Sequence, residues 1–153
     1  MRSWTVLKEF AGGIILVALA GFLQNTNLLN IGGVKPNIAL AVLVTLAFFI
    51  STASVFLVLV VLALIALWFE PVVTLELIIF ALLALGAFFL SQRLPGKSFV
   101  NNLILIGLLT LVFYLIADYR FIVGDPLTVL GEMVYNIILG GVLFAFLTRL
   151  YAP

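Results

Sequence analysis

Glu132 and Asn136 are the side chains of this sequence best suited to chemistry in apolar surroundings. They lie four residues apart, so a helix places both on one face. The stretch 133–148 that follows Glu132 carries no charged residue, and a buried carboxyl group must be paired, hydrated or protonated. Tyr135 lies on an adjoining face and adds a hydroxyl group. The pattern predicts a buried polar site that either binds a partner or fastens neighbouring helices.

A second polar cluster consists of Pro36 and Asn37, directly after Lys35. Proline is tolerated in the first turn of a helix and asparagine is a common N-cap. The cluster therefore indicates a helix start, and two interpretations stay open: a binding position or a plain turn with a cap. Four other polar side chains are expected near the ends of helices, in contact with solvent: Gln24, Glu76, Asn101 and Asn102.

Several kinds of chemistry have no residues to support them. The sequence contains no Cys and no His, so thiolate chemistry, His/Cys metal sites and histidine acid–base catalysis are excluded. Gly32 and Gly33 lack the Lys-Ser/Thr pair of a phosphate-binding loop, and no nucleophile–base pair is apparent. Net charge is +1 without a basic run, which excludes nucleic acid as a partner. We expect no enzyme activity, no cofactor and no metal site.

The elements that position these residues follow from the composition. The chain is 66% hydrophobic and 8% charged, and a soluble domain of 153 residues cannot hide that much apolar surface from water. The apolar runs are continuous rather than alternating, which favours helices over barrel strands in a bilayer. The sequence therefore predicts one all-α, polytopic integral membrane domain over residues 1–153.

A membrane crossing needs about 20 helical residues. The first apolar run continues past Gly21 without a cleavage-type break, so we expect it to be retained as a span. Four stretches fit one crossing each: 6–24, 72–91, 99–117 and 127–150. The stretch 36–69 would extend about 51 Å as one helix, far more than a membrane needs. Its small residues 51–54 allow a turn, giving spans 37–50 and 53–69, although one long tilted helix stays open.

The positions of the basic residues favour six spans. Six spans place five basic residues on the side of the N-terminus and two on the other, whereas five spans place three against four. The positive-inside rule then predicts six helices with both termini in the cytoplasm. Aromatic residues that prefer the interface agree with this topology: Trp4 and Tyr151 at the cytoplasmic side, Trp68 and Tyr119 at the outer side. Asp125 and Pro126 predict the start of the last helix.

Small residues predict where helices approach closely in lipid. The first helix carries Gly13, Ala20 and Gly21 on one face, interrupted by Val17, and the last helix carries Gly141 and Ala145 four residues apart. Each set either packs inside the chain or docks another membrane protein.

Two segments together resemble the bacterial rod shape-determining protein family MreD. One is 33–40, with Pro36-Asn37 before an apolar helix, and the other is 132–140, with Glu132 and Asn136. Gln24, the length and the six apolar stretches also resemble that family. The absence of glycine from 55–69, which ends before Glu70-Pro71, departs from the family's Gly-rich third helix ending in Asp.

The resemblance implies a non-catalytic inner-membrane protein of the cell-elongation machinery that helps to organise peptidoglycan synthesis. It implies a companion membrane protein of the MreC type as partner. It also implies a fold like that of the substrate-binding subunits of energy-coupling-factor vitamin transporters. That kinship supplies an alternative function, the substrate-binding subunit of a small-molecule transporter.

Overall fold

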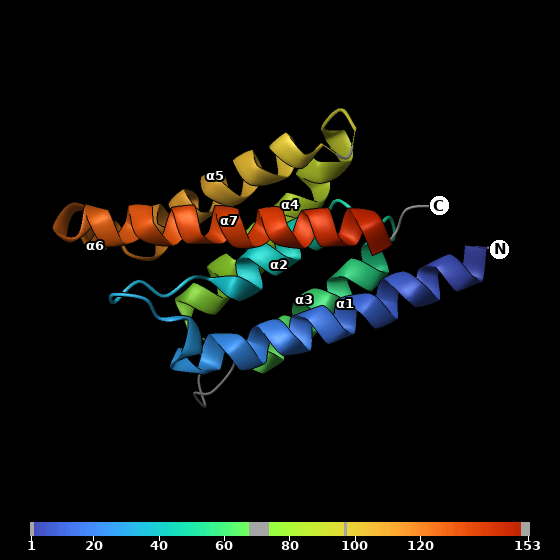
Figure 1. Cartoon of the computed structure of the whole chain (residues 1–153), viewed down its shortest axis with the longest axis horizontal. Helices are drawn as coiled ribbons and strands as arrows, with labels where there is room; N and C mark the ends of the chain where they lie inside the picture. Colours follow the sequence, from blue (N-terminus) through green and yellow to red (C-terminus); the bar gives the residue numbers. More distant parts are fainter. Residues whose placement is uncertain (1, 68–73, 97, 151–153) are drawn as a thin grey trace.

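The chain folds into helices that lie roughly along one long axis (Figure 1). The structure is a computed structural model that describes residues 2–67, 74–96 and 98–150, without the side chains of residues 2–6, 8 and 27. In chain order the elements are α1 (Arg2–Asn25), the 3-10 turn η1 (Asn27–Leu29), α2 (Ile38–Leu46), α3 (Ala53–Leu67), α4 (Leu75–Arg93), α5 (Phe99–Ala117), α6 (Tyr119–Gly124) and α7 (Pro126–Leu150). Within the described residues, extended backbone pairs at an isolated bridge, Ile31 with Val34. The all-α prediction is confirmed.

The outward surface of the helices is as apolar as their interior. Helices α4, α5 and α7 are long and apolar enough to cross a membrane, and the apolar part of α1, Glu9–Asn25, is shorter. Along α7 the exposed side chains recur about once per turn: Leu130, Val134, Ile138 and Val142. A water-facing surface rarely carries such continuous apolar rows, whereas lipid requires them. The chain is therefore a membrane protein.

Helix α2 is the centre of the molecule, surrounded by the longer helices (Figure 1). All nine of its residues are buried. Nine residues extend about 14 Å, roughly half the thickness of the hydrocarbon core. The helix is thus shorter than the expected span 37–50, because a turn follows Leu46 and the buried chain then continues to Ile50 without helix.

The stretch 36–69 forms two helices rather than one, since α3 begins at Ala53. The end of the expected span 53–69, the start of the span 72–91 and Trp68 lie outside the described residues, as does Tyr151. The side chain of Trp4 is likewise not described. Tyr119 is exposed and begins α6, a short helix between α5 and α7 that the apolar pattern does not predict.

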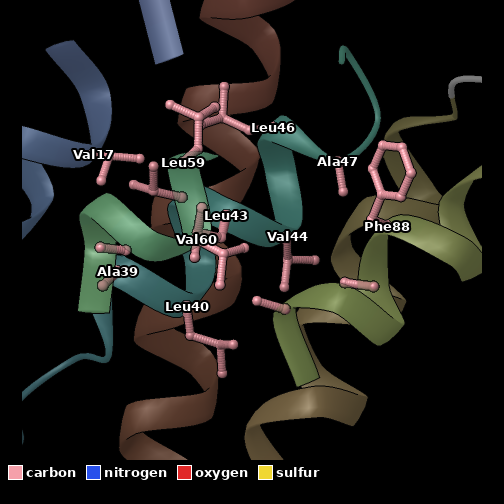
Figure 2. Packing of buried hydrophobic residues seen from close by; sticks show 14 of the residues in the cluster. Val17, Ala39, Leu40, Leu43, Val44, Leu46, Ala47, Leu59, Val60 and Phe88 are labelled. Atoms are coloured by element: carbon pink, nitrogen blue, oxygen red, sulfur yellow. The ribbon is translucent and has the colours of Figure 1, made fainter. Parts of the chain in front are cut away.

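The apolar core forms around α2 and includes residues of α1, α3, α4, α5 and α7. Leu43 and Leu46 of α2 lie close to Leu59 of α3, and Phe88 of α4 covers the end of the cluster (Figure 2). The Phe88 ring stacks on Phe56 with a centroid distance of 4.8 Å. These side chains pack against one another rather than against lipid, so they fix how α3 and α4 lie around α2.

Side chains from two neighbouring helices satisfy the ends of α2. Asn37 accepts from the backbone N–H of Leu40 at 3.1 Å, which confirms the predicted cap. Gln24, half-buried near the end of α1, accepts from the N–H of Ile38 at 2.7 Å and so also caps α2. At the other end, Ser91 of α4 donates to the carbonyl oxygen of Ala47 at 2.8 Å. Buried backbone groups need such partners in a membrane.

Candidate functional site

The functional candidates of α7 meet polar side chains of α5 along the length of both helices. Helices α5 and α7 lie side by side and run in opposite directions (Figure 1). We call the group of five residues between them the polar seam: Asn102, Thr110 and Tyr114 of α5 with Glu132 and Asn136 of α7. Thr110 and Tyr114 are four residues apart, as are Glu132 and Asn136, so the two pairs match across the interface.

The end of the seam nearest α6 contains a carboxyl group. The Tyr114 hydroxyl donates to Oε2 of Glu132, and the Glu132 side chain is 8% exposed. Lys35 also acts electrostatically on the Glu132 carboxyl group. A Cβ built on Gly131 would lie 3.1 Å from the Val34 side chain. The chain before α2 therefore lies against the first turns of α7.

The middle of the seam is fully enclosed. Asn136 donates from Nδ2 to the hydroxyl oxygen of Thr110 at 3.1 Å, and neither side chain is more than 1% exposed. The Oδ1 atom of Asn136 has no partner among the described residues. This contact joins α5 to α7 near the middle of both helices, where hydrogen bonds between helices help to hold them together.

The far end of the seam joins three helices. Asn102 donates to the backbone carbonyl of Gly140 at 3.3 Å and is fully buried, so its expected position at a solvated interface is wrong. A Cβ on Gly140 would collide with Ile106 of α5 and lie 3.3 Å from the Thr45 hydroxyl of α2. Glycine here allows α7 to approach α5 and α2 closely.

The structure thus turns the predicted pair on α7 toward α5 and places the other candidates outside the seam. Tyr135 is half-buried and lies beside the seam rather than in it. Pro36 is buried and Asn37 caps α2. Sequence reasoning missed Thr110 and Tyr114 as partners, although their four-residue spacing matches that of Glu132 and Asn136.

The small residues of α1 face α3. A Cβ on Gly13 would lie 2.5 Å from Leu59, and one on Gly21 would lie 2.5 Å from the Cβ of Ala66. Ala20 is buried on the same side of α1. These residues pack within the chain.

The two small residues of α7 have different surroundings. Gly141 packs against α5, because a Cβ there would lie 3.3 Å from Leu103. Ala145 is exposed. The last helix thus turns one of its small residues toward the chain and the other toward lipid.

The chemistry of the seam is that of hydrogen bonding inside a helix bundle. It supplies a phenol bound to a carboxylate and an amide bound to a hydroxyl, each pair joining α5 to α7. These contacts fit the interpretation that Glu132 and Asn136 fasten helices together.

A double-mutant cycle between Tyr114 and Glu132 should show a coupling of about 1–2 kcal/mol, because Tyr114→Phe removes the donor and Glu132→Leu the acceptor of the same hydrogen bond. The variants are Tyr114→Phe, Glu132→Leu and both, unfolded by a denaturing detergent in mixed micelles. Tyr135→Phe is the matched control and should show no coupling to Glu132→Leu. Glu132→Leu should destabilise more than Glu132→Gln, which keeps a hydrogen-bonding group. Coupling as small as that of the control would show that the phenol does not hold the carboxylate.

Gln24, Pro36-Asn37 and the Glu132–Asn136 pair, the residues on which the predicted resemblance rests, have defined positions in the fold. Comparisons of the chain with protein-family models, curated proteins and solved structures found no match.

Proposed function

We propose that this chain is a non-catalytic scaffold of the MreD type in a bacterial inner membrane, where it helps to organise peptidoglycan synthesis during cell elongation. The observation that supports this is the meeting of the separate segments that resemble the family. Gln24 and Asn37 together cap α2, and Val34 packs against Gly131, next to Glu132. Residues scattered over more than 100 positions thus build one end of the same bundle.

The geometry also suggests how a scaffold of this kind would bind its partners. Glu132 and Asn136 are turned toward α5 and hydrogen-bond there. A partner would therefore contact the outward faces or the ends of the helices. We propose a companion membrane protein of the MreC type as the main partner.

The topology that we propose has six membrane-embedded segments with both termini in the cytoplasm, and α2 is the short central one. The basic residues support it, since five lie on the side of the N-terminus and two, Lys35 and Arg120, on the other. Lys35 lies near the start of α2 and Arg120 in α6, at the same end of the bundle in Figure 1. Reporter fusions after residues 95 and 153 should both be cytoplasmic, and an external C-terminus would contradict six crossings.

The transporter-subunit alternative has less support from the packing. It requires a free face of small residues on the first helix for the transporter partner. Gly13 and Gly21 instead contact α3 within the chain.

Affinity purification of the tagged chain from its native membranes tests the proposal. We expect a coiled-coil membrane protein of the MreC type to be recovered in a mild detergent, together with other cell-elongation proteins. A tagged membrane protein of similar size from the same cells is the control for nonspecific recovery. Recovery of a pair of ATPase subunits would favour the transporter alternative, and recovery of neither group would contradict the scaffold.

A further inference from the structure

A groove of about 340 Å³ runs between α3 and α4 on the outward surface. Its walls include Val61, Leu64 and Ile65 of α3 and Ile78, Ala81 and Leu82 of α4. Along α4 the groove runs from Leu77, about 3 Å from the first residue of the helix, to Leu82, about 10 Å from it. The groove therefore extends from near the helix end into the region of the hydrocarbon chains.

The groove is continuous with the surface that faces lipid. Ile65 and Leu82 are 59% and 64% exposed and belong to the outward faces of their helices. All of the residues that line the groove are apolar. Its surroundings are therefore lipid, and whatever fills it enters from the bilayer.

The side chains that line the groove favour a lipid chain over a helix as its occupant. Helices associate in membranes through small residues that allow close backbone approach, or through polar side chains. The groove offers branched apolar side chains and a single alanine. A partner helix about 10 Å wide and some 30 Å long would gain little from so short a depression. A flexible hydrocarbon chain fits the same space and gains dispersion contacts along its length.

We propose that this groove is a binding site for one acyl chain of a membrane phospholipid. A concave wall contacts the chain on several sides, whereas the outward face of a single helix contacts a lipid on one side only. The lipid in the groove therefore stays bound when detergent removes the others. This site is independent of the scaffold function proposed above.

Photo-crosslinking after delipidation tests the site. Benzoylphenylalanine is placed at Ile78, at the rim of the groove, or at Ile138 on the outward face of α7 as the matched control. The protein is reconstituted in vesicles of palmitoyl-oleoyl phosphatidylethanolamine and phosphatidylglycerol, extracted in dodecyl maltoside, purified by gel filtration and then irradiated. We expect the Ile78 protein to gain the mass of one phospholipid and the Ile138 protein to gain none.

A second change fills the groove. Ala81→Leu should lower the crosslinking yield at Ile78 by about tenfold, because the added side chain occupies the space of the lipid chain. Ala145→Leu, at an exposed alanine of α7, should leave it unchanged. Equal yields at Ile78 and Ile138 in the otherwise unchanged chain would overturn the proposal. So would crosslinking of Ile78 to a protein instead of a lipid in native membranes.

Discussion

Leu43→Ala should destabilise the protein by about 2–4 kcal/mol, whereas Leu108→Ala should change the free energy of unfolding by less than about 1 kcal/mol. Leu43 lies in the centre of α2 with no exposed surface, and its removal leaves a cavity in the apolar core. Leu108 is half-exposed on the outward face of α5, where lipid replaces the missing atoms. The expected loss lies in the lower part of the range for soluble cores, since lipid rather than water surrounds the unpacked helices.

The two leucine variants are compared by unfolding in mixed micelles with increasing denaturing detergent, monitored by helical circular dichroism. Because both variants replace leucine with alanine, the difference between their losses in free energy of unfolding measures the effect of burial. Equal losses at Leu43 and Leu108 would show that α2 does not lie at the centre of the bundle.

Gly21→Ala should destabilise the protein by about 1–3 kcal/mol, despite the higher helix propensity of alanine. The added Cβ would lie 2.5 Å from the Cβ of Ala66, which has no rotamer into which it can move. The backbones of α1 and α3 would have to separate. Ala66→Gly in the same chain should restore most of the lost stability, because it removes the atom that collides.

Gly86→Ala is the matched control for the glycine change. Gly86 lies in α4, and a Cβ built there meets no atom within 4 Å. Alanine should therefore leave stability unchanged or raise it by about 0.5–1 kcal/mol through its helix propensity. A Gly21→Ala variant as stable as the unchanged chain, or one that Ala66→Gly does not rescue, would contradict the close packing of α1 on α3.

The sequence could predict the features of the fold that local chemistry determines. The caps at Asn37 and Asp125 follow from residue type and position, and Asp125 accepts from the N–H of Thr128 at 3.3 Å. The enclosure of α2 could not be predicted, because buried and lipid-facing stretches are equally apolar. The end of α2 at Leu46 could not be predicted either, since no charged residue or proline marks it.

The candidate site was predictable on one helix and not on the other. Glu132 and Asn136 are conspicuous because they are polar residues inside an apolar stretch. Thr110 and Tyr114 are less polar and give no such signal alone. Asn102 lies near the start of α5, where a solvated position is the ordinary expectation, and only the close approach of Gly140 buries it.

The outward faces of this bundle contact lipid, and collision accessibility of spin labels measures that contact. Labels at Ile104 of α5 and Ile138 of α7 lie on outward faces, and a label at Asp125 lies at an exposed helix end. In vesicles, the two outward labels should collide often with oxygen and rarely with a water-soluble nickel chelate, and Asp125 should show the reverse. Nickel accessibility at Ile104 and Ile138 equal to that at Asp125 would place these faces in water and contradict the account.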